Sequence, residues 1–99
     1  MAKLNIEPNQ LRALSHAYKQ EADELRNRSY RLAAQTAPLL HDWVGSASSS
    51  FQTLTHNVDS RQRELISTLE KMAQILASAA DAFDSEDQNI SSAFDDGRG

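Results

Sequence analysis

The sequence predicts an all-α fold: a helical hairpin, in which one turn joins two long helices, that pairs antiparallel with a second hairpin to form an elongated four-helix bundle. Apolar residues recur every three, four or seven positions along two long stretches of the 99 residues, which is the spacing of one helix face. Gly45 is the only glycine before residue 97, and strands joined by tight turns need more glycine than that. The apolar stripes are also wider than one partner helix can cover, which predicts the second hairpin.

The first predicted helix spans about residues 8–40. Pro8 suits the first turn of a helix, where its missing N–H is no loss, and Pro38 is expected to kink or end the helix. Small residues beside the apolar stripe, among them Ala22 and Ser29, favour the close approach of a facing helix. The residues of the stripe that recur at intervals of seven are Leu11, Tyr18, Leu25, Leu32 and Leu39.

The second predicted helix spans about residues 47–90 and follows a turn at 41–46, with Ser46 as its candidate cap. The acidic stretch 91–99 has little to bury and is predicted to be a flexible tail, so that residues 1–90 form a single hairpin domain. We expect the hairpin or dimer core to consist of Leu11, Leu14, Tyr18, Leu25, Leu32, Leu39, Phe51, Leu54, Val58, Leu65, Leu69, Met72 and Leu76.

Composition and charge argue against several classes of function. The chain has no cysteine, and its three histidines lack the spacing of a metal site, so we expect no metal and no other cofactor. His41 and Asp42 lie near several serines, but adjacent residues on a turn seldom form a catalytic triad, and we expect no enzymatic activity. The net charge of -4 disfavours nucleic acid as a partner. No signal peptide or membrane-spanning segment is expected, and contact with membranes is left open.

The triplet Trp43-Val44-Gly45 lies in the middle of the predicted hairpin. With this triplet, the chain resembles the WXG family of small, ESAT-like proteins that bacterial type VII secretion systems export. Phe51 matches the apolar residue that members carry early in helix 2. Members also carry a Y-x-x-x-D/E export signal after helix 2, and Phe83 and Asp87 match its ends, with phenylalanine in place of tyrosine. The resemblance extends over essentially the whole chain.

The resemblance implies a non-enzymatic substrate that is cytoplasmic before export and secreted without a cleavable signal peptide, as a folded homodimer or with a related hairpin protein. It also implies that the chain escorts other effectors and that an FtsK-like ATPase of the secretion machinery recognises it. Phe83 lies about 57 Å along a helix from Gly45, so the two motifs are too far apart to meet within one chain. An antiparallel partner would place its Phe83 and Asp87 beside Trp43 and Val44.

Two other interpretations remain open. An intracellular helical adaptor or targeting chaperone would share this fold and pair with the hairpin of a larger toxin. RNA contact by Arg26, Arg28 and Arg31 ranks third, because acidic residues are interleaved with them. The same apolar stripe serves a homodimer and a heterodimer, so the sequence does not decide between them.

Overall fold

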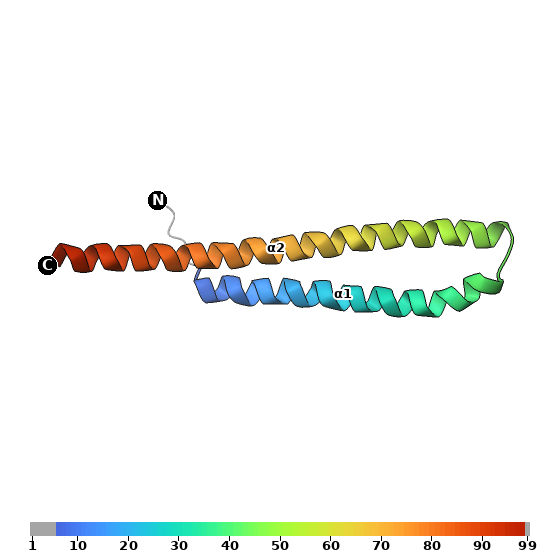
Figure 1. Ribbon diagram of the computed structural model, residues 1–99, viewed down its shortest axis with the longest axis horizontal. Coiled ribbons are helices and arrows are strands. Elements are labelled where there is room, and N and C mark those ends of the chain that lie inside the picture. Colours follow the sequence, from blue (N-terminus) through green and yellow to red (C-terminus); the bar gives the residue numbers. More distant parts are fainter. Residues whose placement is uncertain (1–5, 99) are drawn as a thin grey trace.

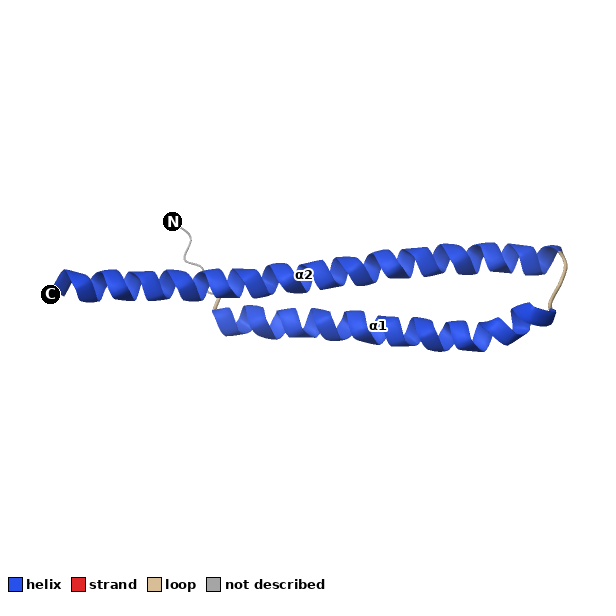
Figure 2. Ribbon diagram, viewed as in Figure 1, coloured by secondary structure: helices blue, strands red, loops and turns tan. Residues whose placement is uncertain are grey.

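The computed structural model describes the backbone of residues 6–98 and the side chains of residues 6–84. Two antiparallel helices, α1 (Pro8–Asp42) and α2 (Ser46–Arg98), lie side by side and are joined by one short turn (Figure 1). Apart from that turn and the residues before α1, everything described is helix (Figure 2). The molecule is a rod of 81 × 25 × 17 Å. The predicted all-α hairpin is therefore confirmed.

The start of α1 lies at Pro8, where the sequence places it. The Gln10 side chain accepts a hydrogen bond of 2.9 Å from the backbone N–H of Glu7, as in a capping box. Pro8 occupies the first turn, which has no intrahelical partner for its N–H in any case. These three neighbouring residues account for the sharp beginning of the helix.

The end of α1 lies at Asp42, slightly beyond the predicted residue 40. Pro38 remains inside the helix, and Figure 1 shows the last turns of α1 out of line with the rest. A proline ring in a helix removes one hydrogen bond and crowds the preceding turn, which bends the axis. Pro38 therefore kinks α1 and does not end it.

The second helix continues to Arg98, past residue 90, where the sequence places its end. No proline or glycine interrupts the chain between Ser46 and Asp96. The flexibility of the stretch 91–99 stays a prediction. Figure 1 shows that α2 extends well beyond the start of α1, so the two helices pair along only part of α2.

The contact between α1 and α2 is made mostly by small side chains. Ala22, Ala73 and Ala80 are almost completely buried, and Ile66 is the one large apolar side chain buried among the described residues. The buried Ser15 hydroxyl donates a hydrogen bond of 2.6 Å to the carbonyl of Ala73. Small residues bring two helix backbones close together, as the alanine and serine positions of the first helix predict.

The large residues of the predicted core are not buried in the hairpin. Leu11, Tyr18, Leu25, Leu69 and Leu76 are half-buried between the helices, and the other eight are exposed. The hairpin therefore closes mainly on its small residues and leaves most of the large residues of the predicted core at the surface. That the large residues form the core of a dimer stays a prediction.

Candidate functional site

The turn between the helices is held by backbone geometry and one side chain. Gly45 has a φ of +114°, a conformation that side chains disfavour, and a Cβ there would meet nothing within 4 Å. Trp43 donates its backbone N–H to the carbonyl of Leu39 at 3.1 Å. The Trp43 carbonyl in turn accepts a 2.8 Å hydrogen bond from the hydroxyl of Ser48, which is only 2% exposed. Ser48 thus ties the first turn of α2 to the end of α1.

The tip of the hairpin presents apolar side chains to solvent. The rings of Trp43 and Phe51 lie 5.6 Å apart between centroids and are tilted by 48°, a favourable aromatic pairing. Val44 is 85% exposed. Pro38, Leu39 and Asp42 form a shallow groove with the tryptophan. The motif therefore forms a fixed surface, with Trp43 half-buried and Val44 projecting.

The predicted export signal lies far from the turn, near the start of α1, and α2 continues beyond it. Phe83 is half-buried on α2, and the side chain of Asp87 lies outside the described residues. Arg12 of α1 forms ion pairs with Asp81 and Asp84 on either side of Phe83. Hydrogen bonds to Asp84, and to a lesser extent to Asp81, raise the pKa of the Arg12 guanidinium above its ordinary value. These ion pairs anchor this part of α2 to the start of α1.

One side of the hairpin carries a continuous row of apolar residues, which we call the apolar flank. Leu11 lies four residues before the buried Ser15, and Leu65 lies one residue before the buried Ile66. Around the helix axis, each leucine is therefore rotated away from the buried residue in the same sense, backward along its own chain. In two antiparallel helices, the same sense of rotation leads to the same side. The apolar flank consists of Leu11, Leu14, Tyr18, Leu25, Leu32, Leu39, Phe51, Leu54, Val58, Leu65 and Met72.

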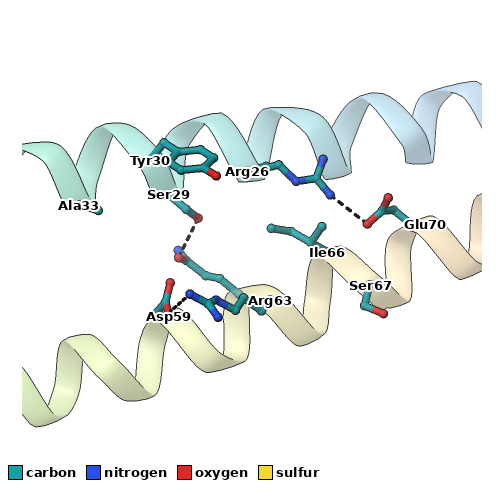
Figure 3. A pocket seen from close by; sticks show the side chains of 10 residues that line it. Arg26, Ser29, Tyr30, Ala33, Asp59, Arg63, Ile66, Ser67 and Glu70 are labelled. Carbon is teal, nitrogen blue, oxygen red and sulfur yellow. Dashed lines mark hydrogen bonds and ion pairs between the residues drawn. The ribbon is translucent and has the colours of Figure 1, made fainter.

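The other side, which we call the ion-paired flank, is linked by charges. Arg26 of α1 lies 3.0 Å from Glu70 of α2, and the Arg12 ion pairs cross the same edge. A groove of about 450 Å³ opens between the helices there, over Ile66 (Figure 3). Its charged groups pair with one another, Arg26 with Glu70 and Arg63 with Asp59. The charges lining the groove are therefore balanced within it.

The described residues show no cluster of histidine and acidic side chains that could hold a metal ion. Within the same residues, neither helix is apolar enough over a sufficient length to cross a membrane. The His41 ring lies 2.9 Å from the Asp42 carboxylate, and both are exposed. The Ser48 hydroxyl points instead to Trp43, so these residues are not arranged as a triad.

Three contacts were missed by the sequence prediction. Ser46, the predicted cap, is itself the first residue of α2, and the hydroxyl of Ser48 bonds the Trp43 carbonyl across the turn. Ser15 and Arg12 bond to residues 58 and 69 positions away, respectively, and sequence spacing gives no signal at such separations. By contrast, Trp43, Val44 and Gly45 lie together at the tip, as predicted, and Phe83 lies far from them in the same chain.

Comparison with known proteins identifies the family that this chain matches. The family model WXG100, described as proteins of 100 residues with WXG, matches residues 3–88. The type VII secretion system extracellular protein A of Staphylococcus aureus is 30% identical over 94 residues, which cover 95% of this chain and 97% of that protein. The homologues are thus secreted proteins of type VII systems.

Solved structures share the fold. The secreted protein EsxB of Bacillus anthracis is 25% identical and has a TM-score of 0.78, covering 86% of this chain and 99% of that one. Geobacillus thermodenitrificans EsxA also has a TM-score of 0.78, with 22% identity over 91% of this chain and 98% of that one. At that level of identity, the second match shows the fold alone.

Proposed function

Because this chain belongs to the WXG100 family, we propose that it is a non-enzymatic substrate of a bacterial type VII secretion system. It is made in the cytoplasm, exported as a folded dimer, and escorts effectors out of the cell. The W-x-G turn at the tip of the hairpin carries this proposal: Gly45 there has the positive φ that favours glycine, and Ser48 bonds the backbone carbonyl of Trp43. The name of the staphylococcal relative, an extracellular protein, supports it.

The apolar flank supports dimeric export. Leu32 is 56% exposed and Leu54 is 64% exposed, and the flank runs along both helices. A contiguous apolar surface of this kind is typical of a protein interface. The partner is a second copy of this chain or a related hairpin protein, and pairing buries the leucines that the hairpin leaves in water.

The recognition surface is shared between two protomers in this proposal. Trp43 and Val44 form the tip of one hairpin, and in an antiparallel pair Phe83 and Asp87 of the other protomer come to the same end. The FtsK-like ATPase of the secretion machinery binds this composite surface. The phenylalanine ring of Phe83 fills an apolar pocket as a tyrosine ring would, without the hydroxyl.

The test is the amount of protein in washed culture supernatant of the native host, at equal intracellular level. The Phe83→Ala, Asp87→Ala double variant is expected to remain in the cells, while Phe83→Tyr and the exposed control Ser78→Ala are exported like the wild type. If the wild type is also retained, the chain is not a substrate. The intracellular adaptor that pairs with a larger toxin then becomes the better interpretation.

A further inference from the structure

On each helix, residues of the apolar flank spaced by multiples of seven lie on both sides of a central leucine. On α1, Leu11 and Leu39 stand equally far from Leu25 in the sequence. On α2, Val58 and Met72 stand equally far from Leu65. A two-fold interface requires this kind of pattern, because a residue on one side of the axis meets its counterpart from the other side.

The hairpin brings the two central leucines to the same height. Ser15 bonds Ala73, and the Ser29 hydroxyl lies 2.8 Å from the Gln62 side chain. Because the helices are antiparallel, residue numbers rise along α1 while they fall along α2 from one contact to the other. Leu25 therefore lies level with Leu65. A single two-fold axis perpendicular to the rod could therefore pass through the centres of both stripes.

The outer edges of the flank follow the same symmetry to within one residue. Glu21 and Arg28 have opposite charges and are both exposed, and they lie four residues before and three residues after Leu25. Leu54 and Ile75, which are 64% and 68% exposed, lie on either side of Leu65. A two-fold rotation brings each of these residues next to its counterpart, so that charge meets opposite charge on α1 and aliphatic meets aliphatic on α2.

We propose that a second copy of this chain covers the apolar flank, with α1 against α1 and α2 against α2, and that Glu21 of each copy pairs with Arg28 of the other. The inference rests on the proposed export as a dimer and adds the residues that select the partner. Glu21 has no ion pair within the described hairpin, and Arg28 has only an exposed one of 3.6 Å with Glu24. Both are therefore available to a partner.

The charged edge also excludes neighbouring registers. Because the stripe repeats every seven residues, sliding one copy by one repeat keeps leucine against leucine. That slide brings Glu21 against Glu21 in one direction and Arg28 against Arg28 in the other, and like charges repel. A hairpin with another charge pattern at this edge would be disfavoured in the same way.

The same register brings the W-x-G turn of one copy close to Phe83 of the other. Ser48 and Ala82 stand equally far from Leu65, so the axis brings them level in opposite copies. Ser48 bonds Trp43, and Ala82 precedes Phe83. Trp43 of one copy therefore lies at the height of Phe83 of the other, at each end of the bundle.

Disulfide formation tests the axis, because the natural chain has no cysteine. A Leu65→Cys variant, oxidised in dilute solution, is expected to form a covalent dimer, since residue 65 lies on the two-fold axis. The control is Glu64→Cys, one residue away and directed off the flank, which is expected to stay uncrosslinked. A failure of Leu65→Cys to crosslink, or equal crosslinking of both variants, would overturn the register.

Charge reversal tests the pair. Glu21→Arg or Arg28→Glu alone is expected to raise the dimer dissociation constant about tenfold, measured by sedimentation equilibrium at low salt. The double variant Glu21→Arg, Arg28→Glu is expected to regain wild-type affinity, and a mixture of the two single variants should form mixed dimers. The control Arg31→Glu lies off this edge and should change little, and helix content by circular dichroism verifies folding.

The outcomes separate this inference from the proposed function. If the wild type is a dimer and neither single reversal changes its affinity, the pairing of Glu21 with Arg28 is overturned while the dimer stands. The same holds if the double variant does not regain wild-type affinity. A wild-type chain that is a folded monomer overturns both the homodimer and this inference, and it favours a heterodimer with a related hairpin. Export of the protein is measured independently of either result.

Discussion

The two flanks of the hairpin are built from the same two helices and differ in whether their side chains find partners within the hairpin. On the ion-paired flank, Arg12 and Arg26 of α1 already meet carboxylates of α2. On the apolar flank, Leu32 and Leu54 are more than half exposed. The charged groups of one side pair within the hairpin, whereas the large apolar groups of the other side are left exposed by it.

This difference shows how one pair of helices can make the contact within the hairpin and also present a surface for the proposed partner. The small residues between the helices hold the hairpin, the charges on one edge pair across it, and the large apolar residues on the other edge are exposed and, in the proposed dimer, contact the partner. Burial of apolar area is the main source of stability. We therefore expect substitutions on the apolar flank to have much larger effects than those on the ion-paired flank.

The largest expected effect is the loss of Leu65 at the centre of the apolar flank. Leu65 is 49% exposed in the hairpin, so truncation in a monomer would matter little. In the proposed dimer it is buried, and Leu65→Ala is expected to lower the free energy of unfolding by about 2–5 kcal/mol. Urea denaturation at several protein concentrations measures this, with Tyr30→Ala as the exposed control on the other flank. A loss below about 0.5 kcal/mol, the level of an ordinary surface substitution, would contradict burial in a dimer.

The next largest effect is expected in the contact between α1 and α2, which lies between the two flanks. Ala22 is completely buried between the helices. Ala22→Leu is expected to destabilise the protein by about 1–3 kcal/mol, because added methylenes push the helices apart. Thermal unfolding followed by circular dichroism tests this against Ala34→Leu, an exposed position on the same helix. Equal melting temperatures for the two variants would mean that the helices do not approach closely at Ala22.

A smaller effect is expected at Ser15, in the same contact. Its buried hydroxyl bonds the Ala73 carbonyl, so Ser15→Ala should reduce the free energy of unfolding by about 0.5–1.5 kcal/mol. The exposed Ser78→Ala is the matched control in the same denaturation experiment. An unchanged stability of Ser15→Ala would show that this hydrogen bond adds nothing beyond what water supplies.

The smallest effect is expected on the ion-paired flank. Glu70 and Arg26 keep about half of their side-chain surface in water, 51% and 41%. Glu70→Gln should therefore change the free energy of unfolding by about 0.2–1 kcal/mol at low salt, and the difference should vanish near 1 M salt because ions screen exposed charges. A difference that persists at high salt would show a contribution other than charge.

Much of the fold was predictable because the heptad pattern and the single interior glycine admit few alternatives. The start at Pro8 and the position of the turn follow from local chemistry. The small residues of the first helix predicted a close helix contact, but the sequence did not show that the large residues beside them stay outside that contact, because Leu11 and Ser15 lie on adjoining parts of the same face. Nor did it distinguish Ser48 from the serines beside it, since only the path of the chain brings the Trp43 carbonyl within reach.

The rod-like outline has a hydrodynamic consequence. The radius of gyration is 22.8 Å, whereas a compact domain of this size has about 13 Å. A single hairpin therefore tumbles slowly and elutes from a sizing column ahead of globular standards of equal mass. Two rods lying side by side double the mass while adding little to the length. Elution volume alone would thus confuse one chain with two, and only methods that report mass directly can count the chains.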